Sequence, residues 1–445
     1  MRRHLEEVDD DYFTKNGDPS YEVRNYDLSL EYKPDSNQLI GRAVLEAVAL
    51  TDLDQFSLDL RGLMVSKVSL DVVPVARFVV RHGKIHIRTE ETIGQGELFR
   101  ITIRYGGRPK PIPDGGDEMG WDELSDGVIV AGQTNGAPSW FPCNDRPANK
   151  ASYRIAVTTP SAYHVVANGI LVSRHRGASA TTWVFEQKEP MATYLATVQI
   201  GRYVSRAVPN STVPITAVLP ERFLDRYDHA FGRQPEMMDC FVRRFGPYPF
   251  RAYTVVITED ELEIPLEAQG LSIFGSNMLS DDWDSTRLVA HELAHQWFGN
   301  SLTLAAWRDI WLHEGFACYC EWLWSEESGS HSANERAVEH WNKLAVKRHL
   351  HRFELEDPGP DHMFDDWVYK RGALLLHSLR LTVGDDVFFE LLSEWVARNA
   401  YGSVTTPKFI SLAEEVTGRD LGELFRVWLT VHALPDLPDL PDQPF

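Results

Sequence analysis

The stretch HELAHQWFGN (residues 291–300) places two histidines four residues apart, with a glutamate directly after the first. On a helix, His291 and His295 stack on consecutive turns of one face. Two imidazoles so placed can bind one zinc ion, and Glu292 can reach a water on that ion as a general base. The alternative is a helix that simply carries polar residues, because so short a pattern also arises by chance. A third ligand is needed to decide between them.

The longer segment DSTRLVAHELAHQWFGN (residues 284–300) predicts the extent of this helix. Asp284 or Ser285 can cap its amino-terminal end, and Gly299 can close its carboxyl end. We therefore expect the residues between these positions to form one helix.

The candidate third ligand is Glu314, which follows His295 after a gap of eighteen residues. It lies in AWRDIWLHEGFACYCEWLW (residues 306–324), where apolar residues recur at helical spacing. A carboxylate between Leu312 and Phe316 is expensive to bury unpaired, and coordination to a dication would offset that cost. Taken alone, Glu314 would be a solvated or salt-bridged helix carboxylate, but the paired histidines upstream favour the ligand.

Four other residues of this second helix have two readings each. Glu321 lies seven residues after Glu314 on the same face, so it is either a partner that holds a ligand histidine or an ordinary surface glutamate. His313 points to another face and is predicted to be a packed or surface histidine. Cys318 and Cys320 are two residues apart and point to different faces, which favours buried thiols over metal ligands.

The pattern of the chain changes near residue 206, which predicts a domain boundary there. Before it, short runs of alternating apolar and polar residues are separated by Gly, Pro, Asn and Asp, which is typical of an all-β sandwich. After it, helical spacing dominates, with one strand at YTVVIT (residues 253–258). We predict a β-sandwich domain at 1–205, a mainly helical domain at 206–434 and a Pro-rich tail at 435–445. The expected strands of the first domain are 21–32, 41–50, 84–90, 98–105, 152–160, 181–187 and 193–201.

Composition excludes several classes of protein. The 445 residues include 44 Lys and Arg against 65 Asp and Glu, a net charge of −21 that repels nucleic acid and attracts cations, although acidity can also serve solubility alone. No apolar run approaches the roughly 20 residues that span a bilayer. Four cysteines form no disulfide framework, and the amino terminus does not read as a secretory signal, so a cytoplasmic location is expected.

The spacing of the two histidines, Glu292 and Glu314 resembles the zinc signature of the aminopeptidases of peptidase family M1. Other segments carry the same resemblance: GAPSWFPCNDRPANKASY (136–153), FGPYPF (245–250) and WVYKRGALLLHSLR (367–380) are similar to family segments. The resemblance extends over residues 20–434 and implies a thermolysin-like zinc catalytic domain after the β-sandwich. It also implies a short form, without the further helical domain that roofs the active site in many members, and hence a more open cleft that tolerates longer peptides.

The resemblance implies a role for each site residue. His291, His295 and Glu314 would hold one Zn²⁺ per chain with a water in the open position. Glu292 would take the proton of that water as it attacks the scissile carbonyl. Tyr369, in VYKRGA, matches the tyrosine whose hydroxyl donates to the oxyanion.

Recognition of a free amine requires a further carboxylate, which the family supplies from a Gly-x-Met-Glu-Asn strand. The aligned stretch here is IPLEA (264–268), in which only Glu267 matches, and Pro265 has no N–H to offer. Glu267 is thus the expected amine anchor, although Glu259, Glu261 and Glu263 are near in sequence. Gln133 matches a family glutamine that helps to hold the amine.

We therefore expect a zinc-dependent metallo-aminopeptidase that removes the amino-terminal residue of peptides. Two alternatives remain: a zinc endopeptidase with the same metal chemistry, and a catalytically silent scaffold. The preferred residue, the physiological peptide and the oligomeric state are not predicted.

Overall fold

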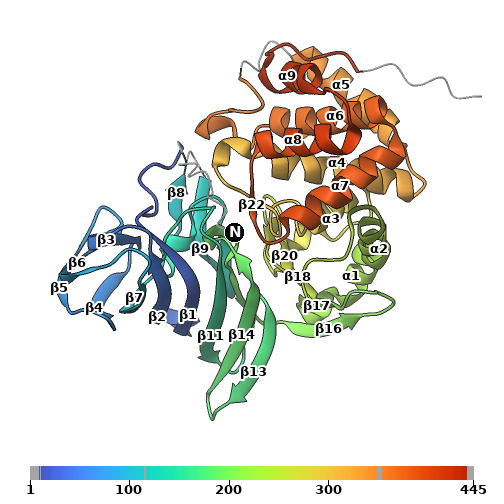
Figure 1. Ribbon diagram of the computed structural model, residues 1–445. Coiled ribbons are helices and arrows are strands. Elements are labelled where there is room, and N and C mark those ends of the chain that lie inside the picture. The colour runs from blue at the N-terminus through green and yellow to red at the C-terminus, as the bar shows by residue number, and fades with distance from the viewer. Residues whose placement is uncertain (1–9, 11, 115–116, 348–352, 438–445) are drawn as a thin grey trace, which may run out of the picture.

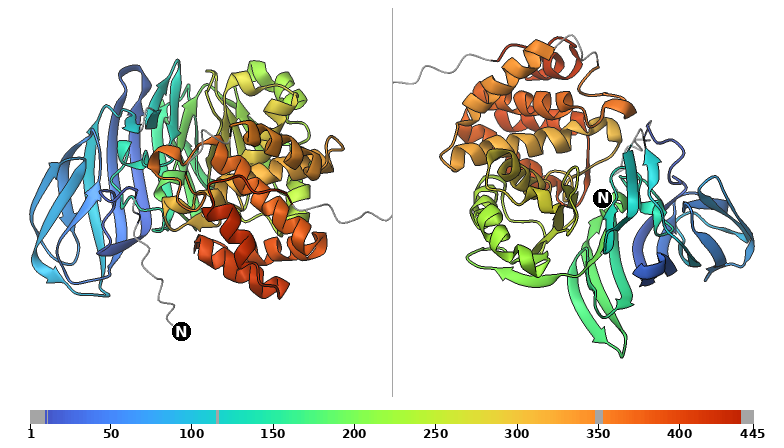
Figure 2. Two further views of the ribbon diagram at one scale, coloured as in Figure 1. Left: turned by 90° about the horizontal axis from the view of Figure 1, so that it is seen from above. Right: turned by 180° about the vertical axis from the view of Figure 1, so that it is seen from behind.

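The computed structural model describes residues 10, 12–114, 117–347 and 353–437. A β-rich part, blue to green in Figure 1, is followed by a helical part in yellow to red. Figure 2 shows that the two parts lie side by side in the other views as well. The predicted order, a β-rich domain followed by a mainly helical domain, is confirmed.

In the strands of the first part, buried residues alternate with more exposed ones. In β1 (Tyr21–Lys33), Val23 is buried at an odd position, whereas Tyr26, Leu28 and Leu30 are buried at even ones. The register of β1 with its neighbour shifts between Val23 and Asn25, and this bulge moves the buried set by one residue. The seven strands of this sheet lie in the order β13 (Ile170–Arg176), β14 (Ala180–Met191), β11 (Ala151–Pro160), β1, β2 (Gln38–Ala49), β7 (Leu98–Gly107) and β4 (Met64–Leu70).

Two smaller sheets complete the first part. One contains β3 (Leu53–Asp59), β6 (Lys84–Ile93) and β5 (Val75–Arg81), and the other contains β12 (His164–Ala167), β15 (Val198–Gly201), β10 (Gly127–Ala131), β9 (Asp117–Leu124) and β8 (Ile112–Asp114). The strand expected over residues 193–201 is wrong in its first half, because residues 193–195 form a 3₁₀ turn before β15.

A fourth sheet belongs to the second part. Its strands are β16 (Val204–Val208), β17 (Ile215–Leu219), β18 (Tyr253–Ile257), β20 (Leu271–Phe274) and β19 (Leu266–Ala268), in that order. The sequence predicted only β18, and the other four strands, with three to five residues each, did not show a period. The predicted boundary at residues 205 and 206 falls inside β16, which pairs with β17.

Helices fill the rest of the described chain. They are α1 (Leu224–Phe231), α2 (Gln234–Phe245), α3 (Trp283–Ala294), α4 (Trp311–Glu327), α5 (Ala333–Lys347), α6 (Asp366–Val383), α7 (Asp385–Asn399), α8 (Thr406–Thr417) and α9 (Gly422–Thr430). In Figure 1, α3 lies between the sheet that contains β18 and β20 and the helices α4 and α6. None of the described helices is long and apolar enough to cross a membrane.

Helix α3 differs from its predicted extent at both ends. Its cap is Asp282, whose Oδ1 accepts from the backbone N–H of Ser285 at 2.8 Å, so the predicted cap at Asp284 or Ser285 is wrong. Its last helical residue is Ala294, and His295 is the residue that follows. The chain then continues in turns to Gly299, whose φ of +134° favours glycine.

Helices α4 and α6 approach each other closely at two glycines. A Cβ atom built on Gly315 would lie 2.8 Å from Cα of Gly372, and the reverse also holds. Only glycines permit this distance between backbones. The contact sets the spacing between Glu314, which precedes Gly315, and Tyr369, one turn before Gly372.

Only the first residues of the predicted tail are described. Nε1 of Trp341 on α5 donates to the carbonyl of Pro435 at 2.7 Å. Residues 438–445, and with them most of the predicted Pro-rich arm, lie outside the described residues.

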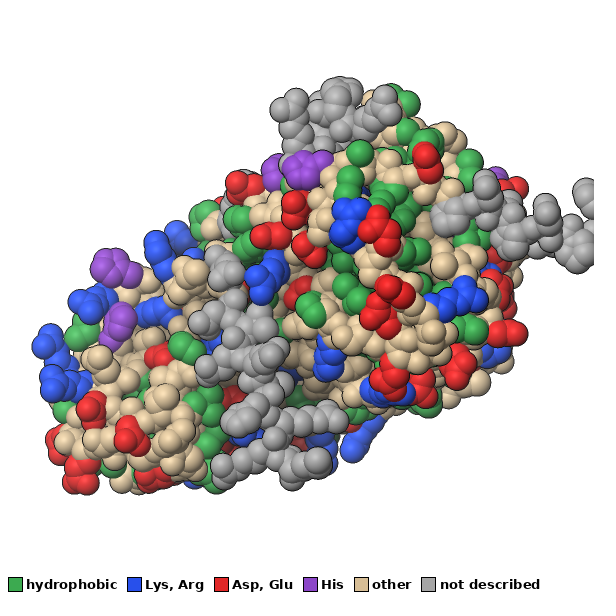
Figure 3. Space-filling model, turned by 45° about the horizontal axis from the view of Figure 1, so that its top comes forward, with side chains coloured by type: hydrophobic (Ala, Val, Ile, Leu, Met, Phe, Trp, Pro, Cys, Tyr) green, Lys and Arg blue, Asp and Glu red, His purple; other side chains and the backbone are tan. Residues whose placement is uncertain are grey.

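The face in Figure 3 shows acidic and basic side chains interspersed over both parts. The net charge of −21 therefore does not gather into a single patch on this face.

Candidate metal centre and active site

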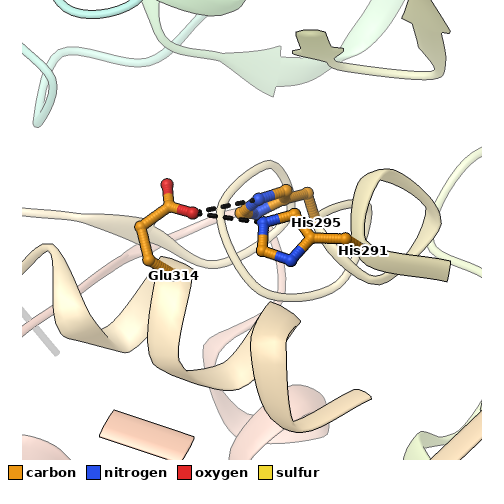
Figure 4. Close-up of side chains that lie close together, drawn as sticks. All are labelled: His291, His295 and Glu314. Carbon is orange, nitrogen blue, oxygen red and sulfur yellow. Dashed lines mark hydrogen bonds and ion pairs between the residues drawn. The ribbon is translucent and has the colours of Figure 1, made fainter. Parts of the chain in front are cut away.

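Helix α3 and the first turn of α4 bring three candidate ligands together (Figure 4). One ligand atom each from His291, His295 and Glu314 lies within 4.8 Å of the other two. Oε2 of Glu314 is 3.3 Å from Nε2 of His291 and 3.5 Å from Nε2 of His295. The three side chains are buried, so water does not screen this cluster of donor atoms.

The other ring nitrogen of each histidine is already held. Nδ1 of His291 lies 2.8 Å from Oε1 of Glu321, and Nδ1 of His295 lies 3.0 Å from the carbonyl oxygen of Phe298. Both partners are acceptors in this arrangement, so both Nδ1 atoms carry a proton, and Nε2 of each ring is the atom that faces Glu314 and is left for a metal ion.

This donor set fits Zn²⁺. Imidazole and carboxylate ligands at about 2.0–2.2 Å in a tetrahedral site are separated by roughly 3.4 Å, which matches the two spacings to Glu314. The carboxylates also give the site a negative potential: although burial lowers it, the neighbouring Glu314 and Glu267 raise the pKa of His295 to about 10. The residues present therefore suit a cation with two nitrogen ligands and one oxygen ligand.

Glu321 is buried against His291, not exposed to solvent. Its Oε2 lies 3.4 Å from Nη1 of Arg287 and 3.8 Å from Nζ of Lys370. Burial raises the pKa of Glu321, but Lys370 and His291 outweigh that effect and lower it to about 2. The carboxylate is thus ionised and able to accept from His291, the arrangement in which a carboxylate orients a ligand imidazole.

Glu292 projects from α3 beside the three candidate ligands. It is buried, and among the described residues its Oε2 has no hydrogen-bond partner. Burial raises the pKa of Glu292 to about 8. An ionisable oxygen without a partner next to a predicted metal site is suited to accept a proton from a water or a substrate.

Glu267 forms a second cluster with Glu292 and His295, in which one ligand atom of each lies within 4.8 Å of the others. It lies on β19, opposite Ser272 of β20. The carbonyl of the next residue, Ala268, accepts from two side-chain amides of the chain after α3, which fixes β19 against that helix. These amides are Nε2 of Gln296 at 3.2 Å and Nδ2 of Asn300 at 3.0 Å.

The three other glutamates near Glu267 in sequence do not belong to either described cluster. Glu259, for example, forms an ion pair with Arg222. Of the four glutamates between residues 259 and 267, only Glu267 lies in a described cluster with a candidate metal ligand.

Tyr369 on α6 packs over the site. Its ring is stacked on the ring of His291, with centroids 5.8 Å apart and planes at 18°. Burial raises the pKa of Tyr369 well above its ordinary value, with the nearby carboxylates acting in the same direction. The phenol therefore keeps its proton at neutral pH and remains a hydrogen-bond donor.

The remaining sequence candidates are one glutamine, one histidine and two cysteines. Gln133, in the loop after β10, has a buried Nε2 without a partner among the described residues. Nε2 of His313 accepts from the backbone N–H of Leu304 at 2.9 Å, so this histidine is packed, as predicted. Cys318 and Cys320 are buried free thiols, and neither belongs to a described metal cluster.

Sequence reasoning missed several supports of the site. The carbonyl of Phe298 carries no side-chain signal at all. Arg287 lies four residues before His291, and Lys370 lies directly after Tyr369, so their positions could have suggested cations near Glu321. Tyr194 reaches the site from the β-rich part, and its hydroxyl lies 3.4 Å from the carbonyl of Gly299.

Comparisons with known proteins identify relatives of this chain. Residues 22–195 match the family model described as the Peptidase M1 N-terminal domain, and residues 229–428 match the Peptidase family M1 domain. "Aminopeptidase M1-D" of Oryza sativa subsp. japonica is 24% identical over 425 residues, and "Leucyl aminopeptidase" of Saccharolobus solfataricus is 26% identical over 341. These matches cover 88% and 70% of this chain but only 46% and 42% of the two relatives.

Solved structures match over almost the whole chain. An M1 zinc metallopeptidase from Deinococcus radiodurans is 30% identical, with a TM-score of 0.87, and the match covers 97% of this chain and 99% of that one. The structure of a Glu-to-Ala mutant of an M1 zinc metallopeptidase from Deinococcus radiodurans, bound to a Tyr-Ser-Ala substrate, gives a TM-score of 0.88 at 30% identity.

Proposed function

The chain belongs to peptidase family M1, and from this premise we propose that it is a zinc-dependent aminopeptidase that removes the amino-terminal residue of peptides. One observation carries the proposal: the Glu267 carboxylate lies in one cluster with Glu292 and His295, beside the three candidate zinc ligands. A metal centre with a fixed carboxylate next to it can hold a peptide by its terminal ammonium while the adjacent peptide bond is hydrolysed.

His291, His295 and Glu314 hold the metal in this proposal. When bound, Zn²⁺ supplies Lewis-acid polarisation of the substrate carbonyl and lowers the pKa of a water at its open position. The protein's own contribution is to fix the ligands, which Glu321 and the Phe298 carbonyl do through the two Nδ1 atoms.

Glu292 moves the proton. Its oxygen accepts a proton from the attacking water as the new C–O bond forms, and passes it to the leaving nitrogen as the C–N bond breaks. Its raised pKa suits both halves of this transfer near neutral pH.

Tyr369 and Glu267 bind the two ends of the reacting unit. The Tyr369 hydroxyl donates to the oxygen of the scissile carbonyl as negative charge develops there. Glu267 accepts from the terminal ammonium, and Gln133 is proposed to help hold the same group. Charge pairing with the ammonium inside the site selects peptides with a free amino terminus.

A panel of aminoacyl fluorogenic substrates tests the proposal. We expect cleavage of free-amine substrates, loss of cleavage with a chelator and recovery with Zn²⁺. Failure of the purified protein to bind zinc would instead favour the catalytically silent scaffold.

The same experiment separates the proposal from a zinc endopeptidase. An endopeptidase would cleave amine-blocked peptides as well as free ones, and Glu267→Gln would change little. An aminopeptidase would leave acetylated peptides intact, and Glu267→Gln would raise KM for free-amine substrates.

A further inference from the structure

Lys150, from the β-rich part, reaches into the helical part beside the metal site. It directly precedes β11, and its Nζ donates to the carbonyl oxygens of Asn300 at 3.0 Å and Ser301 at 2.9 Å. Among the described residues, no carboxylate lies within ion-pair distance of Lys150. Burial lowers its pKa to about 7. An ammonium with two carbonyl partners and no counter-ion is expensive to bury. This cost indicates that the two bonds contribute to the structure.

The two carbonyls belong to the turn that follows α3. In this turn three successive backbone N–H groups bond five residues back: Asn300 to His295 at 2.9 Å, Ser301 to Gln296 at 3.2 Å and Leu302 to Trp297 at 3.1 Å. The turn is therefore wider than an α-helix, and it leaves the carbonyls of Asn300 and Ser301 to partners outside the helix. Lys150 donates to both of them, and Oγ1 of Thr303 also donates to the carbonyl of Asn300 at 3.2 Å.

The same turn holds a metal ligand. The carbonyl of Phe298, two residues before Asn300, accepts from Nδ1 of His295 at 3.0 Å. That bond fixes which nitrogen of His295 carries the proton and how its ring is oriented. The side chain of Asn300 also donates to Ala268, the residue after Glu267. The position of the turn thus determines the position of His295 and, through β19, that of Glu267.

We propose that Lys150 is a positioning residue through which the β-rich part orients the imidazole of His295. The inference rests on the metal role of His295 in the proposed function. Lys150 does not touch the site; it acts through the turn at residues 298–301. The β-rich part, on this account, is not only a neighbour of the metal centre but one of its supports.

The test is the zinc affinity of the full chain, measured by competition with a chromogenic chelator. Lys150→Met removes both donated bonds while keeping a long apolar side chain. We expect its zinc affinity to fall about tenfold, the lower end of the roughly 10–100-fold range for groups that orient a ligand. The cobalt-substituted Lys150→Met protein should also show a shifted visible spectrum, because the geometry at His295 has changed. Lys150→Arg keeps donors and should restore most of the affinity.

Lys84→Met is the matched control. Lys84 also loses buried bonds on substitution, to Asp59 at 2.8 Å and to the carbonyl of Gly17 at 2.8 Å, but both partners lie within the first 60 residues, in the β-rich part. It should leave zinc affinity unchanged. Equal affinity of wild type and Lys150→Met, or equal losses in Lys150→Met and Lys84→Met, would overturn the inference.

A milder variant covers the case in which Lys150→Met does not fold. Lys150→Gln keeps one donor group and should show an intermediate affinity, and wild-type affinity in that variant would also overturn the inference. If the wild type itself binds no zinc, the proposed function fails, which is a separate result from any difference between the variants.

Discussion

Nδ1 of His291 lies 2.8 Å from Oε1 of Glu321, two turns along α4 from Glu314. One helix thus supplies both a candidate metal ligand and the carboxylate that orients another. Because Glu321 is itself held by Arg287 and Lys370, the ring of His291 is fixed from behind before any ion binds.

Loss of this support should weaken metal binding. We predict that Glu321→Gln lowers zinc affinity about 10–100-fold, because the amide is a poorer acceptor for His291 Nδ1 and leaves the buried Lys370 and the partly buried Arg287 less compensated. Chelator competition measures the effect. Glu327→Gln is the matched control on the same helix, since Glu327 pairs with Arg243 and Arg244 on the surface. Unchanged affinity in Glu321→Gln would refute the orienting role.

Glu292 should be needed for turnover and not for metal binding. We predict that Glu292→Gln lowers kcat about 10²–10⁴-fold, because the amide cannot accept the proton of the attacking water. Its zinc content, measured by mass spectrometry of the metal, should equal that of the wild type. Substantial activity in the zinc-loaded variant would contradict the assignment of Glu292 as the base.

The contact of Gly315 with Gly372 should control the position of Tyr369. In Gly372→Ala the new Cβ would lie 2.8 Å from Cα of Gly315, so α6 must move away from α4. We predict a stability loss of about 1–3 kcal/mol. We also predict a lower kcat with little change in KM, the same pattern as Tyr369→Phe, since both reduce donation to the developing oxyanion.

Gly422→Ala in α9 is the control for this substitution. There a Cβ would meet only side-chain oxygens, the nearest being Oδ1 of Asp420 at 3.3 Å, so kcat should not change. Wild-type kcat in Gly372→Ala would show that the helix spacing does not matter for the reaction.

His164 should make the protein sensitive to acid. Burial and the nearby Arg174 lower its pKa to about 4, below the ordinary 6.5, so the folded protein binds fewer protons than the unfolded chain between these values. This contribution to stability is fully present above about pH 6.5 and is lost as the pH falls toward 4, and the loss at pH 5 is roughly 2 kcal/mol.

His164→Phe keeps a ring against Trp183, whose centroid lies 4.5 Å from that of His164, but cannot titrate. Its thermal midpoint should fall less than that of the wild type between pH 7.5 and pH 5. His340 and His377, whose pKa values burial also lowers to about 4, keep part of the acid sensitivity in both proteins. Parallel pH curves for the two proteins would contradict the prediction.

The parts of the fold that have a period could be predicted from the sequence. The long strands alternate, and helices such as α4 and α6 repeat apolar residues over four turns or more. Strands such as β19, with three residues, have no period to detect, yet β19 carries Glu267. The cap of α3 was misplaced by two residues or more because Asp282, Asp284 and Ser285 are all competent caps, and only tertiary structure decides among them.

The candidate site could likewise be predicted only in part from the sequence. Two histidines four residues apart can be recognised in the sequence of any helix, whereas the partners that orient their rings cannot. Glu321 could be suspected from its helical face, but the Phe298 carbonyl has no side-chain signature. Lys150 lies 141 residues from His291 in the sequence, and the sequence carries no local sign of its contact with the turn.

Diffraction data collected at the zinc absorption edge, from crystals grown with one equivalent of Zn²⁺, test the central claim most directly. The account predicts one strong anomalous peak about 2.0–2.2 Å from Nε2 of His291, Nε2 of His295 and a carboxylate oxygen of Glu314. No peak at that position, or a peak bound by other residues while these three side chains point apart, would contradict it.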